Sequence, residues 1–542
     1  MFFVKKRLWT FYGIMFMAVC ALAFRIFTIS DGNTLHAASG QSSVTVTVGN
    51  TRGTIYDRNR VPFVNSQTEY RASVTSGVRA ISALSEVLDT ADFEKMSKTL
   101  QNGKPAVVSL TKLAAAEGIT LFQLPKRYGS RVLAPHLIGY MDGGQIEGLV
   151  GLEKTFNELL TKFSGTATVK YTVDATGKPL SGIAPQIINT INNSKGGVVL
   201  TLDATIQETV EDIASKHMQK GAVVVMSPES GEILAMASLP TYQPTTVTEV
   251  LNREDAPLLN RAICSYNCGS VFKIVSAAAA LETGVSTNAV YRCFGHSQIG
   301  DTRFHCHERL GHGALSMPAA FAKSCNCYFI ELMQDVGSEA LFNMSSRLQF
   351  DSTLSLCEGF MSTTATLPTQ NDLVSPAVLA NLSFGQGELT ATPLHIAQLI
   401  STVVNDGTLT VPKLIYGYMD EGGNMEYAPQ NYMSQQVFSA QTAQTLRDYM
   451  IGVVEEGGTG FTGKPSVGGA GAKTGTAETG WAKKENEQYD VVQSWYAGFY
   501  PAQNPQYVIV ALAENAQNTH ANTAAVFKEI ADALYQYKKT TE

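Results

Sequence analysis

The first hydrophobic segment is an uncharged, mostly apolar run at residues 8–24, which follows a basic flank at residues 5–7. If Arg25 snorkels toward the membrane surface, the run extends by a few residues and is long enough to cross a bilayer as a helix. A basic flank favours a cytoplasmic N-terminus with the following chain outside. We therefore predict an uncleaved single-pass anchor over residues 1–30, with a signal peptide cleaved near Ala37 as the alternative.

The pattern is weak between this run and residue 195. Residues 31–43 are mostly small and polar, as is typical of a linker. Valine alternates with threonine over residues 44–48, which predicts a strand, and a charged, turn-rich stretch follows at residues 52–59. We predict a separate, non-catalytic domain over residues 31–195.

A clearer pattern begins near Gly196 and frames a long, mainly helical middle from about residue 258 to residue 455. Asp203 is placed to cap a helix whose apolar residues recur at helical spacing. Strands from both chain ends, with helices between them, predict an α+β domain built on an antiparallel sheet over residues 196–542. The predicted strands are 198–202, 222–226, 232–237, 472–477, 494–499 and 507–512, and a helix over 523–537 closes the chain.

Composition narrows the class of protein. The 542 residues are too many for one ordinary domain. A content of 44% hydrophobic and 16% charged residues excludes a disordered chain. The net charge of −7 argues against a nucleic-acid binder, because phosphate backbones select basic surfaces.

The first candidate for chemistry is Ser270, which lies three residues before Lys273 at the start of a predicted helix. Residues at i and i+3 share a helix face, so the lysine can take the serine proton if burial lowers its pKa. The helix N-terminus also favours a developing oxyanion. Taken alone, S-x-x-K is more often a capping serine beside a surface lysine.

A second candidate is the pair Ser324 and Asn326, which lies between two apolar helical stretches. Held in a tight connection, the hydroxyl and the amide can point into one cleft. Taken alone, the pair is typical of a polar loop between helices.

The third candidate is the run Lys473-Thr474-Gly475-Thr476, which follows a glycine-rich stretch. On a strand the two threonines face the same side, and the glycine lets a substrate backbone approach closely. Taken alone, the run is typical of a glycine-rich edge strand. In the order S-x-x-K, S-x-N and K-T-G, however, the three motifs together are characteristic of β-lactamases and penicillin-binding proteins.

The chain resembles a class B penicillin-binding protein over nearly its whole length. No glycosyltransferase signature, such as an E-D-x-x-F run, is visible in its N-terminal third, which distinguishes it from class A. It departs from the family pattern at Arg60, where glycine is usual, and at Cys268, where proline is usual. Outside the three motifs, the resemblance is carried by residues 52–59, the G-x-x-G-L-E segment at 148–153, Asn260-Arg261, Gly385-Gln386-Gly387, Thr392-Pro393 and residues 473–478.

The resemblance implies a pedestal or dimerisation domain followed by a transpeptidase domain with a five-stranded antiparallel sheet flanked by helices. It implies acyl transfer, in which Ser270 attacks the penultimate D-Ala carbonyl of a D-Ala-D-Ala stem peptide without a cofactor or metal. An amine of a second stem peptide then takes the acyl group, whereas β-lactams acylate Ser270 and stall. The implied roles are Lys273 as base, Ser324 as proton relay, Asn326 on the substrate amide, Lys473, Thr474 and Thr476 on the terminal carboxylate, and the N–H groups of Ser270 and Thr476 as oxyanion hole.

The resemblance also implies partners: peptidoglycan stem peptides, β-lactams, the cytoplasmic membrane, a partner glycosyltransferase and other membrane proteins of cell-wall synthesis. The alternative functions are a β-lactam-hydrolysing enzyme, a β-lactam sensor, and a scaffold for synthesis partners. A hydrolase does not need the long segment before Gly196, a sensor needs a signalling domain that is not visible, and the intact motifs argue against a scaffold without catalysis.

A cluster of cysteine and histidine residues lies within twenty residues of the middle segment. Its spacing permits a zinc site, whereas an extracytoplasmic location favours a disulfide between Cys293 and Cys306; unpaired thiols are the third alternative. We rank the disulfide first and zinc last. The cluster consists of Cys293, His296, His305, Cys306, His307 and His312, and the metal ligands of the zinc alternative are Cys293, His296, Cys306 and His307.

Overall fold

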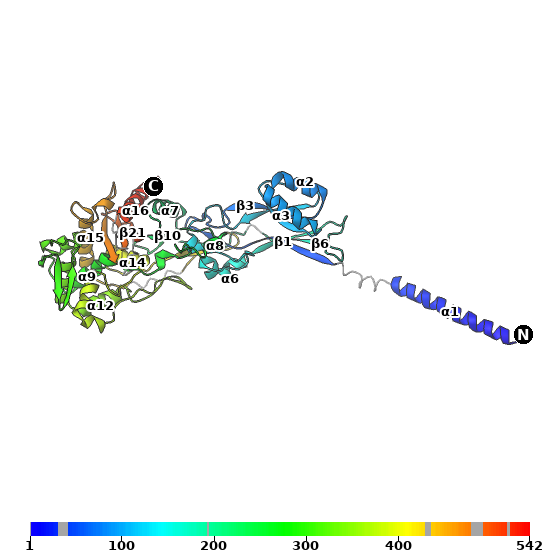
Figure 1. Cartoon of the computed structure of the whole chain (residues 1–542), viewed down its shortest axis with the longest axis horizontal. Coiled ribbons are helices and arrows are strands. Elements are labelled where there is room, and N and C mark those ends of the chain that lie inside the picture. Colours follow the sequence, from blue (N-terminus) through cyan, green and yellow to red (C-terminus); the bar gives the residue numbers. More distant parts are fainter. Residues whose placement is uncertain are drawn as a thin grey trace. The chain divides into compact units, whose positions relative to one another are not determined.

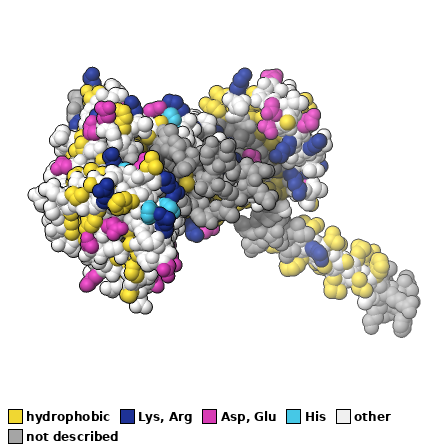
Figure 2. Space-filling view, turned by 60° about the vertical axis from the view of Figure 1, so that its left-hand side comes forward, with side chains coloured by type: hydrophobic (Ala, Val, Ile, Leu, Met, Phe, Trp, Pro, Cys, Tyr) yellow, Lys and Arg dark blue, Asp and Glu magenta, His cyan; other side chains and the backbone are white. Residues whose placement is uncertain are grey.

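The computed structural model describes residues 2–30, 42–191, 194–428, 435–478, 492–516 and 521–541. Helix α1 (Phe2–Ser30) contains a stretch, Trp9–Phe27, that is long and apolar enough to cross a membrane. Figure 2 shows hydrophobic side chains over the described part of this helix. The predicted N-terminal helix is therefore confirmed.

The chain divides into two compact units (Figure 1). Unit 1 consists of residues 1–51, 68–125 and 165–192, and unit 2 consists of residues 52–67, 126–164 and 193–542. The domain limits drawn from the sequence remain a prediction, but unit 2 contains two segments, 52–67 and 126–164, that precede the expected boundary near residue 195.

Unit 1 contains two three-stranded sheets. One has the order β1 (Ser43–Thr51), β6 (Gly165–Thr172), β7 (Gln186–Asn189), and the other has the order β4 (Ala106–Leu110), β3 (Gln67–Val74), β5 (Ile119–Lys126). Residues of α2 (Val78–Val87) and α3 (Thr90–Gln101) share a buried cluster with the second sheet. Asp89 caps α3 by accepting a hydrogen bond from the backbone N–H of Asp92.

Unit 2 is built on a five-stranded antiparallel sheet with the order β10-β9-β21-β20-β19. Two of its strands come from residues 221–239 and three from residues 471–516, whereas the predicted strand 198–202 lies in a different sheet, so the prediction of one sheet is wrong in this respect. The α+β domain with a five-stranded antiparallel sheet flanked by helices, which the resemblance implies, is confirmed. The strands are β9 (Gly221–Met226), β10 (Ile233–Leu239), β19 (Gly471–Glu478), β20 (Val492–Tyr500) and β21 (Tyr507–Ala516).

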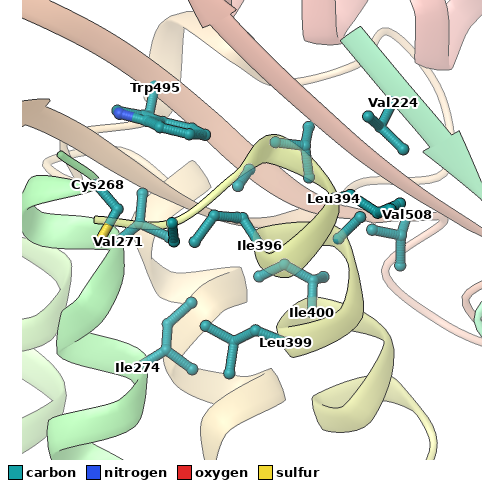
Figure 3. Close-up of a cluster of buried hydrophobic side chains, with 14 of the residues drawn as sticks. Val224, Cys268, Val271, Ile274, Leu394, Ile396, Leu399, Ile400, Trp495 and Val508 are labelled. Carbon is teal, nitrogen blue, oxygen red and sulfur yellow. The ribbon is translucent and has the colours of Figure 1, made fainter. Parts of the chain in front are cut away.

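Alternate residues of these strands enter two different cores, because side chains along a strand point to opposite faces. Val223 and Val225 pack with α7 (Ala204–His217) and α16 (Ala521–Thr541), and Val224 packs with the buried central helix α14 (Pro393–Val404). Figure 3 shows α14 between the sheet and α9 (Lys273–Glu282), with Leu394 near Val508 and Leu399 near Ile274. Helix α9 therefore packs against a helix that is itself buried.

A second sheet of unit 2 has the order β18-β17-β8-β2, and β2 runs parallel to β8. The predicted strand 198–202 lies here, as β8, and the charged stretch at residues 52–59 supplies β2. Asp203 caps α7, as predicted. The strands are β2 (Thr54–Tyr56), β8 (Gly197–Leu200), β17 (Ile415–Met419) and β18 (Met425–Tyr427).

The remaining elements of unit 2 are short strands and helices. The strands pair as β11 (Tyr291–Cys293) with β14 (Gly313–Leu315), β12 (His296–Ile299) with β13 (Thr302–His305), and β15 (Ser355–Cys357) with β16 (Phe360–Met361). The helices are α4 (Pro135–Ile138), α5 (Gly151–Thr155), α6 (Asn157–Lys162), α8 (Val247–Val250), α10 (Met317–Ala322), α11 (Asn326–Val336), α12 (Ser338–Arg347), α13 (Pro376–Ser383) and α15 (Ala440–Val454), and the 3-10 turns are η1 (Arg261–Ile263), η2 (Gly269–Phe272), η3 (Asp372–Val374) and η4 (Phe461–Gly463).

Candidate active site

Ser270 lies in the 3-10 turn η2, directly before the first residue of α9. The turn places the serine hydroxyl at the N-terminal, positive end of the helix, where a developing negative charge is favoured. The side chain is half-buried, whereas its neighbours Val271 and Phe272 are fully buried. The hydroxyl is therefore held rigidly but remains accessible.

Lys273 is fully buried and points its ammonium group at the other motif residues. Its Nζ lies within hydrogen-bond distance of four oxygen atoms: Ser270 Oγ at 3.0 Å, Asn326 Oδ1 at 2.6 Å, and the carbonyl and hydroxyl oxygens of Ser324 at 2.6 and 3.3 Å. Burial lowers the pKa of Lys273 to about 8, although the neighbouring thiols oppose the shift. A substantial fraction of this amine is therefore neutral near pH 8, the form that accepts the serine proton.

Ser324 forms the tight connection between α10 and α11. Its backbone lies in the left-handed region, with φ of 51°, a conformation that a non-glycine residue holds only when its surroundings enforce it. The turn points its hydroxyl into the cluster of motif residues, and the side chain of Asn326 follows on the first turn of α11. A residue outside the three motifs also orients Asn326, because Asn326 Nδ2 donates to the carbonyl oxygen of His305 at 3.2 Å.

Lys473 reaches the same point from strand β19. It is fully buried, and its Nζ donates to Ser324 Oγ at 2.9 Å and to the carbonyl of Thr474 at 3.1 Å. Burial, and then the nearby charge of Lys273, lower the pKa of Lys473 well below its ordinary value. Ser324 Oγ thus accepts from two amines, which connects the three motifs through one hydroxyl.

The K-T-G strand lies directly against the nucleophile turn. A Cβ atom at Gly475 would lie 2.8 Å from the carbonyl oxygen of Cys268 and 2.9 Å from Val271 Cγ2. The glycine thus allows β19 to pack on η2, and its expected contact with a substrate backbone stays a prediction. Thr474 is buried and shares a hydrogen bond of 2.9 Å with the hydroxyl of Thr459, whereas Thr476 is partly exposed.

The structure therefore brings Ser270, Lys273, Ser324, Asn326 and Lys473 together, although the last two motifs lie far apart in the chain. Two neighbours of the motifs were not recognised from the sequence. Thr459 carries no motif, and only its pairing with Thr474 identifies it. Cys325 is the middle residue of the S-x-N motif and is fully buried.

The cysteine and histidine cluster differs from its predicted arrangement. All eight cysteines are free, so the favoured disulfide between Cys293 and Cys306 is not formed. The zinc alternative stays a prediction, although the structure brings a different set of side chains together. His296 Nε2 lies 2.8 Å from a guanidinium nitrogen of Arg303, and the exposed His307 is replaced in the cluster by His312 and Cys325.

Residues 221–532 match the family described as the penicillin binding protein transpeptidase domain. Stage V sporulation protein D of Bacillus subtilis is 30% identical over 398 residues, which cover 71% of this chain and 59% of that protein. Peptidoglycan D,D-transpeptidase PbpA of Mycolicibacterium smegmatis is 30% identical over 348 residues, which cover 59% of this chain and 68% of that protein. Penicillin-binding protein 3 of Mycobacterium tuberculosis, solved in complex with aztreonam, superposes with a TM-score of 0.65 at 26% identity, covering 92% of this chain and 97% of that one.

Proposed function

The chain belongs to the penicillin-binding protein transpeptidase family; we propose that it is a serine-type D,D-transpeptidase that cross-links peptidoglycan stem peptides through an acyl-enzyme on Ser270. The observation that carries the proposal is the hydrogen-bond chain from Ser270 Oγ through Lys273 Nζ and Ser324 Oγ to Lys473 Nζ. A serine hydroxyl becomes a useful nucleophile only beside a base, and this chain supplies one.

In the acylation step, neutral Lys273 removes the proton of Ser270 while Oγ attacks the carbonyl carbon of the penultimate D-Ala. The backbone N–H groups of Ser270 and Thr476 stabilise the tetrahedral oxyanion. Collapse of the intermediate breaks the peptide bond, and Ser324 passes the proton from Lys273 to the leaving amine of the terminal D-Ala. Asn326 orients the substrate amide.

The residues of strand β19 select the substrate. The terminal carboxylate of the donor peptide binds Lys473 with the hydroxyls of Thr474 and Thr476, and this negative charge favours the protonated form of Lys473. The amine of a second stem peptide then attacks the ester and releases Ser270. A β-lactam gives an acyl-enzyme whose amine stays tethered in the opened ring, so deacylation stalls.

We also propose the cellular setting. Helix α1 anchors the chain in the cytoplasmic membrane with its N-terminus inside, and the transpeptidase unit faces the peptidoglycan. Residues 31–195 act as a non-catalytic pedestal or dimerisation domain. A partner glycosyltransferase, with other membrane proteins of wall synthesis, supplies the glycan strands.

The test is a cross-linking reaction of the full-length chain with a glycosyltransferase and lipid-linked disaccharide pentapeptide. We expect cross-linked muropeptide dimers together with free D-Ala, and neither product with Ser270→Ala. Free D-Ala without dimers would make the protein a carboxypeptidase. Rapid consumption of penicillin without a lasting adduct would favour the hydrolase alternative.

A further inference from the structure

Four side chains of metal-ligand type converge beside the S-x-N motif of unit 2. Cys293 ends β11, Cys306 follows β13, His312 precedes β14, and Cys325 lies between Ser324 and Asn326. Their ligand atoms all lie within 4.8 Å of one another. Since β11 pairs with β14, with Cys293 opposite Gly313, the sheet itself brings Cys293 next to His312.

The separations fit a tetrahedral zinc ion. Cys306 Sγ lies 4.0 Å from Cys325 Sγ and 3.6 Å from His312 Nδ1. Zinc–sulfur bonds of about 2.3 Å and zinc–nitrogen bonds of about 2.0 Å place tetrahedral ligand atoms roughly 3.5–3.8 Å apart. A disulfide needs sulfur atoms about 2.05 Å apart, so the arrangement is that of a metal site and not of a bridge.

The sulfur atom of Cys293 is also oriented by the backbone. The N–H of Gly295 donates a hydrogen bond to Cys293 Sγ at 3.5 Å. Hydrogen bonds of this kind orient metal ligands.

Two glycines allow the ligand loops to close on one another. Gly295 and Gly311 have φ of 84° and 85°, in the left-handed region that favours glycine. A Cβ at Gly295 would lie 2.1 Å from the carbonyl oxygen of Arg309, and one at Gly311 would lie 2.4 Å from that of Cys293. The two glycines thus allow the loops that contain Gly295 and Gly311 to pack closely against each other beside the sulfur atoms.

We propose that Cys293, Cys306, His312 and Cys325 bind one zinc ion in a closed, tetrahedral Cys3His site that holds the S-x-N motif in place. Four protein ligands leave no open position, which is the pattern of a structural and not a catalytic zinc site. The three cysteines are at most 3% exposed, so the site is shielded from water and from oxidants.

The site contacts the catalytic cluster at two points. Cys325 is the middle residue of the motif, and the carbonyl of His305, next to Cys306, accepts the hydrogen bond of Asn326. A metal that fixes both cysteines therefore fixes Ser324 in its left-handed conformation and Asn326 in its orientation. The four ligands are positioning residues, and their effect on acylation rests on the function proposed above.

The first test is metal analysis of the full-length chain, purified without a histidine tag. We expect about one zinc per chain in the wild type and in Cys357→Ser, whose thiol lies outside the cluster, and roughly a tenth of that in Cys306→Ser and His312→Ala. Equal zinc in all four proteins, or none in the wild type, would overturn the site. The intact mass of the protein, measured without reductant, is a second readout, because a disulfide bond between Cys306 and Cys325 would refute the proposal.

The second test uses the wild-type chain and does not depend on how the variants fold. Exchange of the metal for Co(II) is expected to give the intense visible bands of a tetrahedral thiolate site, whereas a pale octahedral spectrum would contradict the assignment. Zinc removal should slow acylation by labelled penicillin by about tenfold, and added zinc should restore it. Zinc binding without any penicillin adduct would contradict the proposed function but not the zinc site. An adduct that forms at the full rate on zinc-free protein would contradict the positioning role but not the proposed function.

Discussion

Two clusters of buried charged side chains in unit 2 are organised in opposite ways. In the first, the fully buried Glu153 accepts hydrogen bonds from Arg127 Nε at 2.7 Å and Nη2 at 2.8 Å, and from the hydroxyl of Tyr128 at 3.0 Å. Arg52 adds a weaker ion pair at 3.7 Å, and Arg127 also donates to the carbonyl of Gly53 at 2.6 Å. Each charge in this cluster faces an opposite charge.

The second cluster contains Lys273 and Lys473, which are buried as completely as Glu153. Neither lysine forms an ion pair with a carboxylate among the residues that the structure describes, and their partners are hydroxyl, amide and carbonyl oxygens. Burial therefore lowers the pKa of both lysines, and the nearby charge of Lys273 lowers the pKa of Lys473 further. A buried charge that has an opposite charge beside it therefore stabilises the fold. A buried lysine without such a partner loses its proton more easily, and its neutral amine can act as a base.

The largest expected effect comes from removing the base while keeping its volume. Lys273→Met should slow acylation by penicillin by roughly 10²–10⁴-fold, the range of general-base catalysis. The free energy of unfolding should stay the same or rise, since the substitution removes an uncompensated buried amine. Stopped-flow acylation and urea unfolding measure the two quantities. A stable variant that acylates at the wild-type rate would remove Lys273 from the mechanism.

A second substitution tests the cluster in which Glu153 is paired with Arg127 and Arg52. Glu153→Gln leaves two buried arginines without their counter-charge, so the free energy of unfolding should fall by about 3–5 kcal/mol. The matched control is Glu147→Gln in the same segment, whose side chain is exposed and whose loss should change stability by no more than about 0.5 kcal/mol. The folded fraction of both variants should acylate normally. Equal stability of the two variants would show that the cluster is not an anchor.

A smaller effect probes the contact between β19 and the nucleophile turn. Gly475→Ala pushes a Cβ against Cys268 and Val271, which should cost about 1–3 kcal/mol of stability and slow acylation. Gly452→Ala in α15 is the control, because its Cβ meets no atom within 4 Å and alanine favours a helix by about 0.5–1 kcal/mol. Indistinguishable melting temperatures for the two variants would argue against tight packing at Gly475.

The smallest effect is the dependence of acylation on pH. Because the neutral form of Lys273 is active and its pKa is about 8, the rate should rise about tenfold from pH 7 to pH 9 and level off above. The same shift has a consequence for stability: the unfolded chain binds the proton more tightly, so this lysine makes folding more favourable as pH rises from about 8 toward its ordinary pKa of 10.5. A rate that falls over this interval would exclude a neutral Lys273 as the base.

Much of this site was predictable because its signals are local. S-x-x-K places two groups on one helix face, and S-x-N needs only a tight turn between helices. The sheet was predictable as well, since apolar strand pairs with turn residues between them mark β9 and β10, and β20 and β21. Asp203 was recognised as a cap from its place before a periodic helix, and the structure agrees.

The remainder depends on long-range pairing, which local patterns do not encode. Arg127 carries no motif, and only the folded chain brings it to Glu153. The sequence also does not reveal that β19 packs on η2 at Gly475, because the two segments lie far apart in the chain. Spacing along the chain favoured His296 and His307 as histidine ligands, whereas the pairing of β11 with β14 brings His312 next to Cys293.

The role of Ser270 as the nucleophile is tested most directly by peptide mass mapping of the full-length chain after exposure to labelled penicillin. We expect one stable adduct on the peptide that contains Ser270, absent in Ser270→Ala and formed far more slowly in Lys273→Met. An adduct on another residue, or an unreacted protein with the penicillin left intact, would contradict it.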